Sequence, residues 1–268
     1  MEQITSKDNK FIKEYTKLST SKSERKQQQK FVVEGKKLID EAFSSGIKIE
    51  MVFVTEAFIQ KSELKKNTPF LEKLFQNTTC FLISTAIENK IAMTKTPEGI
   101  FAICDIMENN LTLENIKKNG HYIMLVDLQD NGNVGTIIRA AEAIGIDGVI
   151  LTSCTCDIFS QKLIRASMGS SFRVKTLIVQ DELLFLKQLA ENGVKTYASV
   201  IDSDANNIKE VSFSNPSVLL IGNEGNGISK QISQSCDEKV TIKMQGKTES
   251  LNAAMASCIL MWEMIGDK

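Results

Sequence analysis

The fold is decided by the stretch Ser217-Val218-Leu219-Leu220-Ile221-Gly222-Asn223-Glu224-Gly225-Asn226-Gly227. Its first five residues form a short apolar run, which is typical of a strand buried on both faces of a parallel sheet. Three glycines follow within six residues, and glycine lets the backbone adopt a positive φ and approach a ligand closely. The stretch therefore predicts a buried strand that ends in a ligand-binding turn.

A second strand and turn follow the first. We expect a strand at 239–244, after which Glu249-Ser250-Leu251-Asn252 leads into an apolar helix that ends near Ile265. Ser250 or Glu249 can cap this helix, because short polar side chains accept hydrogen bonds from free amides at a helix start. If the two strands are neighbours, their turns line one crevice.

The sequence upstream of these strands predicts the larger of two α/β domains. Strands and helices alternate from Tyr122 onward, which favours a mainly parallel sheet covered on both faces. The strands are expected at 122–127, 148–152, 172–179 and 195–201, and the helices at 133–144, 159–167 and 181–192.

The first third of the chain predicts a small α/β/α sandwich. A helix is expected at 8–18, capped by Asp8 or Ser6, and the polar residues 19–30 are either mobile or a polar helix. Further strands are expected at 31–33, 49–55, 79–83 and 99–106. Helices are expected at 36–45, at about 58–77 with a break near Pro69, and at 85–93. Polarity then rises, which predicts an N-terminal domain at 1–107, a linker at 108–120 and a C-terminal domain at 121–268.

Composition narrows the class of protein. Hydrophobic residues make up 42% of the 268 residues and charged residues 24%, as in ordinary globular proteins. No apolar run approaches the ~18 residues that a membrane span needs. The polar, lysine-rich N-terminus does not resemble a signal peptide, and the six cysteines are expected to be reduced thiols, so we expect a cytoplasmic protein without a membrane partner.

Histidine-based chemistry is almost excluded, because His121 is the only histidine. Ser-His-Asp triads, Cys-His dyads and histidine metal sites are therefore not expected. Cys154 and Cys156 form a C-x-C pair, but no second pair stands at zinc-finger spacing, so structural thiols are favoured over a metal site.

Positive charge is concentrated near the N-terminus, although the net charge is −1. Residues 1–37 hold 10 Lys and Arg against 5 Asp and Glu, whereas residues 106–268 hold 15 against 19. A solvated helix face explains such a charge run as well as a phosphate contact does, so composition alone leaves both open.

A third turn combines amides, glycines and one arginine. Asp130-Asn131-Gly132-Asn133-Val134-Gly135 precedes Arg139, and a helix start near Asn133 would put Arg139 in its second turn, pointing to the crevice. An arginine there suits a phosphate or a developing oxyanion, and the alternatives are a capped helix start and a surface salt bridge. Neither a P-loop nor a Rossmann glycine motif is present.

Together these turns resemble the three motifs of the SpoU (TrmH) family of RNA ribose 2′-O-methyltransferases, in the SPOUT superfamily. The first is Asn133-Val134-Gly135-Thr136-Ile137-Ile138-Arg139-Ala140-Ala141, the second Leu220-Ile221-Gly222-Asn223-Glu224-Gly225-Asn226-Gly227-Ile228, and the third Ile242-Lys243-Met244 with Glu249-Ser250-Leu251-Asn252-Ala253-Ala254-Met255-Ala256. Arg165-Ala166-Ser167-Met168-Gly169-Ser170 looks like a further family segment. Phe31-Val32-Val33-Glu34-Gly35 resembles the family's substrate-binding domain, which is related to ribosomal protein L30e.

The resemblance implies an L30e-like N-terminal domain that binds RNA, and a C-terminal domain with a deep trefoil knot. The knot would hold S-adenosylmethionine through residues that match the family's cofactor contacts: Gly222, Ile242, Leu251, Asn223, Gly227 and Ala253. It also favours 23S ribosomal RNA over transfer RNA as the substrate, and it leaves open both a transfer RNA 2′-O-methyltransferase and a resistance-type methyltransferase.

The resemblance further assigns catalytic roles. Arg139 would position a phosphate and stabilise the forming alkoxide, because a guanidinium is too basic to act readily as a base. Asn133 would orient Arg139 or the ribose, and Glu224 would aim Arg139 or hold its own loop. Ser250 and Asn252 would complete the pocket.

The C-terminal helix and the alternative functions still have to be considered. The helix at 252–265 is apolar over more than one stripe, so it is either wholly buried or pairs with a second copy, and the resemblance favours a homodimer. Two other functions stay in view: a non-catalytic RNA-binding protein of the same fold, and another nucleotide-dependent enzyme such as a small dehydrogenase, whose motifs are lacking.

Overall fold

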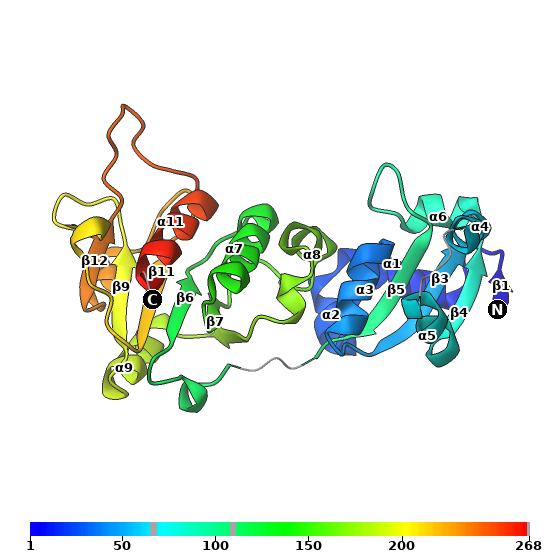
Figure 1. The fold of residues 1–268 in the computed structure, drawn as a ribbon, viewed down its shortest axis with the longest axis horizontal. Coiled ribbons are helices and arrows are strands. Elements are labelled where there is room, and N and C mark those ends of the chain that lie inside the picture. Colours follow the sequence, from blue (N-terminus) through cyan, green and yellow to red (C-terminus); the bar gives the residue numbers. More distant parts are fainter. Residues whose placement is uncertain (65–68, 108–110, 267–268) are drawn as a thin grey trace. The chain divides into compact units, whose positions relative to one another are not determined.

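The structure, a computed structural model, describes residues 1–64, 69–107 and 111–266. It divides into two compact units (Figure 1). The first unit consists of Met1–Glu108 together with Phe159–Phe172, and the second of Asn109–Ile158 and Arg173–Lys268. The two-domain α/β fold that the sequence predicts is confirmed, and the chain passes between the units three times rather than once.

The first unit contains a five-stranded mixed sheet in the order β1-β4-β3-β5-β2. Strands β1, β4 and β3 run parallel, while β5 runs antiparallel to both β3 and β2. The strands are β1 (Glu2–Ile4), β2 (Lys30–Glu34), β3 (Ile49–Thr55), β4 (Thr79–Ile83) and β5 (Ile100–Asp105). The helices are α1 (Lys10–Thr20), α2 (Lys22–Gln28), α3 (Lys36–Ser44), α4 (Glu56–Leu64), α5 (Pro69–Asn77) and α6 (Thr85–Ile91).

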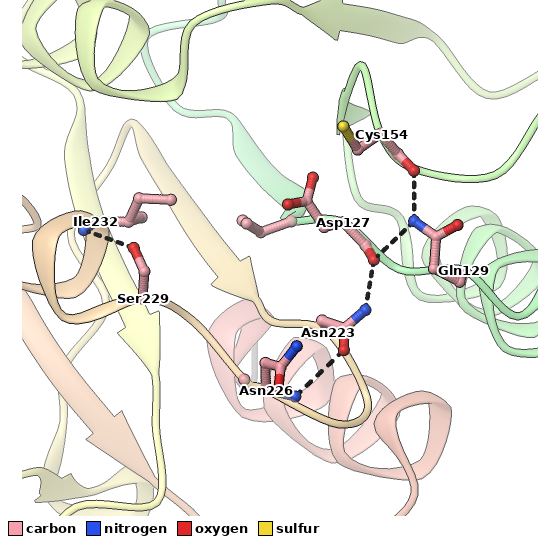
Figure 2. A pocket seen from close by; sticks show the side chains of 9 residues that line it. Asp127, Gln129, Cys154, Asn223, Asn226, Ser229 and Ile232 are labelled. Atoms are coloured by element: carbon pink, nitrogen blue, oxygen red, sulfur yellow. Dashed lines mark hydrogen bonds between the residues drawn. The ribbon is translucent and has the colours of Figure 1, made fainter.

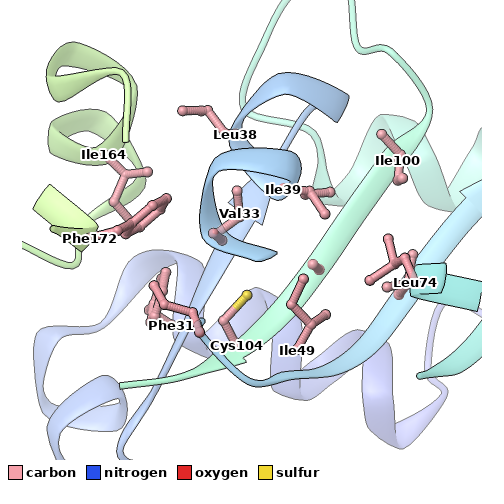
Figure 3. Packing of buried hydrophobic residues seen from close by; sticks show 14 of the residues in the cluster. Phe31, Val33, Leu38, Ile39, Ile49, Leu74, Ile100, Cys104, Ile164 and Phe172 are labelled. Carbon is pink, nitrogen blue, oxygen red and sulfur yellow. The ribbon is translucent and has the colours of Figure 1, made fainter. Parts of the chain in front are cut away.

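Helices cover both faces of this sheet, as an α/β/α sandwich requires. On one face, Tyr15 and Leu18 of α1 pack on Phe53 and its neighbours. On the other face, Leu38 and Ile39 of α3 and Leu74 of α5 belong to one core cluster with Phe31 and Val33 of β2 (Figure 3). Residues 19–30, which the sequence left open, include helix α2, and the cap of α1 is Asn9 instead of Asp8 or Ser6.

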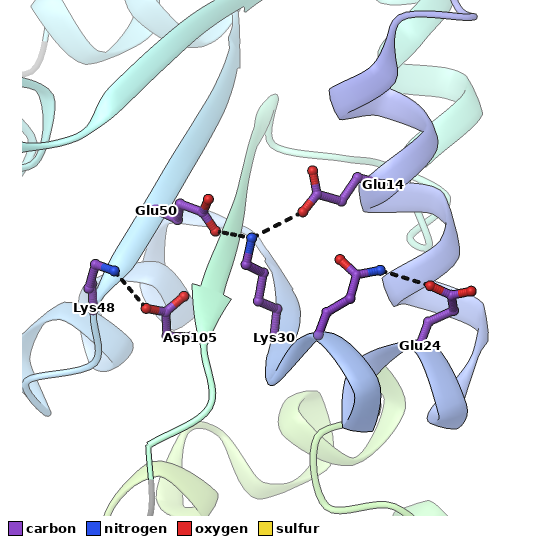
Figure 4. A network of polar contacts seen from close by, with 7 residues as sticks. Glu14, Glu24, Lys30, Lys48, Glu50 and Asp105 are labelled. Carbon is purple, nitrogen blue, oxygen red and sulfur yellow. Dashed lines mark hydrogen bonds and ion pairs between the residues drawn. The ribbon is translucent and has the colours of Figure 1, made fainter.

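A lysine joins three elements of the first unit. Lys30 of β2 pairs with Glu14 of α1 at 3.2 Å and with Glu50 of β3 at 2.6 Å (Figure 4). Burial alone would lower the pKa of Lys30, but the hydrogen bonds to Glu50 and Glu14 outweigh it, so its pKa is raised. Lys30 therefore stays charged and fixes α1 against the sheet.

The first unit completes its core with residues from the middle of the chain. Helix α8 (Gln161–Ser167) and the 3₁₀ turn Ser170–Phe172 belong to this unit. Ile164 and Phe172 are buried against Phe31, and Gln161 donates a 2.9 Å hydrogen bond to the hydroxyl of Tyr15. The predicted strand at 172–179 is therefore too long, because Phe172 packs in the other unit and only Thr176–Val179 forms β8.

The second unit contains a seven-stranded parallel sheet in the order β10-β12-β9-β11-β6-β7-β8. The strands are β6 (His121–Leu125), β7 (Gly148–Thr152), β8, β9 (Lys195–Ser199), β10 (Asn206–Asn207), β11 (Ser217–Ile221) and β12 (Glu238–Thr241). The helices are α7 (Asn131–Ile144), α9 (Glu182–Glu191), α10 (Lys230–Gln234) and α11 (Ala253–Ile265). Strand β9 separates β11 from β12, so the two strands of the opening motif are not neighbours.

Both faces of the central strands are covered. Met124 of β6 and Leu220 of β11 share a core cluster with Phe185 and Leu189 of α9. Because alternate residues of a strand point to opposite faces, the buried Ile123 points to the other face, where α7 and α11 pack against each other. The site described next lies at the carboxyl edge of this sheet. No helix among the described residues is long and apolar enough to cross a membrane.

Candidate functional site

The turn after β6 and the turn after β11 meet at one edge of the sheet. The two strands pair in parallel, with Leu125 opposite Ile221, so their carboxyl ends emerge side by side. Helix α7 begins in the first turn, where the carboxylate of Asp130 accepts a 2.8 Å hydrogen bond from the amide of Asn133. The crevice between two parallel strands at this edge is where α/β sheets bind ligands.

Three side chains form a hydrogen-bonded chain across this crevice. Asn133 donates through Nδ2 to Oε1 of Glu224 at 3.1 Å. Its own Oδ1 accepts from Nδ2 of Asn252 at 3.0 Å. The three residues come from the three predicted motifs, so the structure brings these motifs together. We name Asn133, Glu224 and Asn252 the amide–carboxylate chain.

The carboxylate in this chain is held in its ionised form. Burial by itself would raise the pKa of Glu224. The amide of Asn133 and the backbone N–H groups of Glu224, Gln129 and Asp130 donate to it, and together they lower the pKa below its ordinary value. Glu224 therefore accepts hydrogen bonds at neutral pH and fixes the amide orientation of Asn133.

The turn Gly222–Gly227 is folded tightly on itself. Asn223 accepts through Oδ1 from the amides of Gly225 and Asn226, at 2.9 and 3.2 Å. Its Nδ2 donates at 2.7 Å to the carbonyl of Asp127 in the neighbouring turn. A Cβ on Gly222 would lie 2.3 Å from the carbonyl carbon of Gly227, so only glycine fits there.

The third motif contributes a capped helix start. Asn252 caps α11 by accepting from the amides of Ala254 and Met255, at 2.9 and 3.3 Å. The prediction that Ser250 or Glu249 caps this helix is therefore wrong, because the first helical residue is Ala253 and its cap position is Asn252. Ser250 is exposed and forms no hydrogen bond with any residue that the structure describes.

Arg139 lies on the exposed surface of α7. Because α7 begins at Asn131, Arg139 stands in its third turn and not its second. It is about 9 Å along the helix axis from Asn133 and roughly 120° around it. Glu224 bonds with Asn133, and the role of Glu224 in aiming Arg139 stays a prediction. Within the described ranges, Arg139 has neither an ion pair nor a hydrogen bond, which leaves its guanidinium available.

The residues predicted to hold the cofactor follow strands on one side of the crevice. Gly222 follows β11 and Ile242 follows β12, so both lie at the carboxyl edge of the parallel sheet. Two apolar side chains in the loops of this region, Leu251 and Ile201, are 38% and 77% exposed. Exposed apolar side chains beside bare glycine backbone suit a ligand that is part purine and part polar chain, so these residues fit S-adenosylmethionine.

A polar pocket of about 370 Å³ lies between the turns that follow β6, β7 and β11 (Figure 2). It is lined by Val126, Asp127, Gln129, Cys154, Asn223, Asn226, Gly227, Ser229 and Ile232. Asn223 and Gly227 were predicted from the motifs as cofactor contacts, whereas Asp127 and Gln129 were not predicted as site residues. The position of Asp127, a carboxylate beside the carboxyl end of a buried strand, is the signal that could have identified it.

A parallel α/β sheet with a site at its carboxyl edge is an arrangement that commonly binds nucleotide-like ligands. Comparison with known families is more specific. Residues 120–262 match the model of the SpoU rRNA methylase family, and residues 9–102 match the MRM3-like substrate binding domain. The chain belongs to the SpoU rRNA methylase family.

Similar proteins match nearly the full length of the chain. The 23S rRNA (guanosine(2553)-2′-O)-methyltransferase RlmP of Bacillus subtilis is 31% identical, over 99% of this chain and 100% of its own length. An AdoMet-bound rRNA methyltransferase from Sinorhizobium meliloti is 26% identical, with a TM-score of 0.84 over 98% of this chain and 97% of that one. An RNA 2′-O ribose methyltransferase is 25% identical, with a TM-score of 0.80 and 98% coverage of both chains.

The family and these structures establish the class of reaction. The protein is an RNA methyltransferase, and S-adenosylmethionine is its cofactor. The prediction of the family and of the cofactor from the three motifs is confirmed. The roles of individual side chains remain predictions.

Proposed function

We propose that this enzyme transfers a methyl group from S-adenosylmethionine to a ribose 2′-hydroxyl of 23S ribosomal RNA. The observation that carries the proposal is the amide–carboxylate chain, which joins the three motifs at the β6/β11 crevice. The B. subtilis relative, similar over its full length, acts on 23S rRNA and supports the choice of RNA. Because the proposed substrate is ribosomal RNA, we also expect the enzyme to be cytoplasmic.

The chain's own residues would prepare the acceptor. The cofactor, when bound, supplies an electrophilic methyl group, and Gly222, Ile242 and Leu251 would hold it. Asn133 has both its amide oxygen and one amide hydrogen occupied, so it is rigid and presents its remaining hydrogen to the ribose. Rigid polar groups of this kind place the hydroxyl in line with the methyl carbon.

Arg139 would supply positive charge next to the ribose hydroxyl that accepts the methyl group. A guanidinium keeps its proton in proteins, so Arg139 acts as a cation and not as a base. It would bind the phosphate beside the target ribose and stabilise the alkoxide as the hydroxyl loses its proton to phosphate or water. Ser250, Asn223, Gly227 and Ala253 stay candidates for contacts around the two ligands.

The first unit would supply affinity for RNA. It matches a substrate-binding family over residues 9–102. Lys10, Lys13 and Lys17 are all exposed on α1, at spacings of three and four residues that place them on one helix face. We name these three residues the lysine face, and we infer that it contacts RNA phosphates.

The second unit would pair with another copy of itself. Met255, Ile259 and Trp262 recur on one face of α11 at helical spacing and are 58%, 38% and 68% exposed. The opposite face is already buried, through Leu260, Met261 and Met264. A second apolar face that stays exposed on a helix is typical of a protein–protein interface.

The trefoil knot that the family resemblance implies also remains a prediction.

Mapping of 2′-O-methylated nucleotides tests the proposed function directly. Ribosomal and transfer RNA from cells with and without the gene are compared, and one ribosomal nucleotide should lose its ribose methyl group. The purified protein with S-adenosylmethionine should restore methylation of that nucleotide in RNA from the deletion strain. Loss of a transfer RNA methyl group instead would contradict the choice of RNA.

A further inference from the structure

We propose that the polar pocket binds the base of the target nucleotide and selects guanine through the carboxylate of Asp127. The inference rests on the proposed function and names the part of the RNA that this pocket would read. It follows from where the pocket lies, from how its polar groups are held, and from the hydrogen-bonding groups that remain unused.

The pocket shares Asn223 and Gly227 with the predicted cofactor contacts, but Gly222, Ile242, Leu251 and Ala253 do not line it. Its residues follow β6, β7 and β11, whereas Ile242 follows β12, which is two strands beyond β11 on the opposite side. A methyl transfer needs its donor and its acceptor on opposite sides of the moving carbon. With the cofactor toward β12, the acceptor nucleotide belongs on the side of β6 and β7.

The pocket also touches the amide–carboxylate chain. Gln129 lines the pocket, and its backbone amide donates to Oε2 of Glu224 at 3.5 Å. Asn223, the residue before Glu224, lines the pocket as well. A base held here would bring its own ribose toward Asn133 and Glu224, where the 2′-hydroxyl has to react.

Asp127 is fixed in an unusual conformation. Its φ is +55°, in the left-handed region that non-glycine residues rarely adopt. Its amide donates to Oγ1 of Thr152 at 2.9 Å, and that hydroxyl donates to Oδ1 of Asp127 at 2.6 Å. Asn223 holds its carbonyl at 2.7 Å. Contacts that keep a residue in a strained conformation are characteristic of ligand sites.

The carboxylate of Asp127 keeps unused hydrogen-bond acceptors after these contacts. Oδ2 of Asp127 has no hydrogen bond within the described part of the chain, and Oδ1 keeps a lone pair. Gln129 cannot compete for them, because its amide hydrogens already donate to the carbonyls of Cys154 and Asp127, at 2.5 and 3.2 Å. Ile232 and Val126 add apolar lining for the faces of a ring.

Two adjacent acceptors select guanine among the four bases. The Watson–Crick edge of guanine carries two neighbouring donors, N1–H and N2–H₂, which a carboxylate can accept together. The corresponding edges of adenine, cytosine and uracil all place an acceptor beside a donor, so one carboxylate oxygen would face a lone pair. A pocket of about 370 Å³ is large enough for one unstacked base.

The test compares guanosine with inosine, which lacks the 2-amino group, at the methylated position of a ribosomal RNA fragment. For the wild-type enzyme, inosine should lower kcat/KM by about 10-fold or more, the discrimination expected from a lost base contact. Asp127→Asn keeps the acceptor for Thr152 but replaces one free acceptor by a donor, so its guanosine-to-inosine ratio should fall close to one. Cys154→Ser, at another lining residue, should keep the wild-type ratio.

Several results would overturn the inference. A mapped nucleotide other than guanosine, or the same inosine penalty in wild type and Asp127→Asn, removes the base assignment and leaves the proposed function intact. Weaker S-adenosylmethionine binding by Asp127→Asn in calorimetry assigns the pocket to the cofactor instead. Absence of any transfer to 23S ribosomal RNA overturns the proposed function, and this inference with it.

Discussion

Asn252 donates a 3.0 Å hydrogen bond to Oδ1 of Asn133, although 119 residues separate them along the chain. The same Asn252 caps α11, and the same Asn133 stands in the first turn of α7. The contact therefore fixes two helix starts relative to each other. Asn133 passes the constraint to Glu224, so the three turns of the site behave as one rigid group.

Arg139→Ala should lower methyl transfer by at least about 100-fold, as expected for the loss of one preorganised charge. S-adenosylmethionine binding should persist, because Arg139 forms no hydrogen bond or ion pair within the described ranges. Single-turnover rates and calorimetry measure the two quantities. Thr136→Ala is the matched control, since Thr136 is exposed one turn earlier on α7. A variant at position 139 with near wild-type turnover would remove Arg139 from the mechanism.

Asn133→Ala should raise the pKa of Glu224. Burial already acts to raise it, and the variant removes the side-chain donor that opposes burial. In the wild type the pKa lies below 4.5, so the stabilisation from ionised Glu224 is complete above that pH and is lost as pH falls through the lowered value. Carboxyl ¹³C NMR of labelled Glu measures the shift, and an unchanged titration would contradict the role of Asn133.

Changing Lys10, Lys13 and Lys17 together to Gln should weaken RNA binding and reduce its salt dependence. Three lost phosphate contacts lower the slope of log K against log salt by about 2 to 3. Filter binding at several salt concentrations measures both effects. The control changes three exposed lysines of the second unit, Lys187, Lys209 and Lys230. Equal losses for both triple variants would show that the lysine face has no special role.

Trp262→Glu should convert a dimer into monomers, because it puts a charge into the exposed apolar face of α11. Light scattering of the wild type should give about twice the 29.8 kDa chain mass. Glu263→Gln changes the next exposed residue of the helix and should leave the mass unchanged. A wild-type monomer that methylates RNA at the full rate would defeat the proposal of a dimer.

Phe172→Ala should destabilise the first unit by about 3 to 5 kcal/mol, since Phe172 is 3% exposed and its ring lies 5.7 Å from that of Phe31. Phe172→Leu should lower the stability of the first unit much less. Hydrogen exchange of β2 amides locates the effect. Exchange that changes only in the second unit would show that Phe172 does not support the first.

The alternation of strands and helices was predictable, because each element carries its own periodicity. The order of the strands was not predictable: the condition that β11 and β12 are neighbours is not met, because β9 lies between them. Strand order depends on long-range pairing that local patterns do not encode. Strand β1 and strand β10 are too short to give a pattern.

The site was predictable to a similar extent. The motifs identified Asn133, Glu224 and Asn252, but no feature of the sequence could show that these three bond in series. Asn252 was expected beside the cap and proved to be the cap itself, since one residue decides which side chain reaches the free amides. Asp127 was missed because the contact that holds its carboxylate comes from Thr152, at the end of the next strand.

The placement of Phe159–Phe172 in the first unit has a consequence for synthesis of the chain on the ribosome. The N-terminal unit lacks part of its core until Phe172 has been made, roughly 60 residues after Glu108. At about 5 to 20 residues per second, translation needs several seconds for that distance. During this time Phe31 lacks two of its ring partners, Phe159 and Phe172. Truncation before residue 159 would make this vulnerable intermediate permanent.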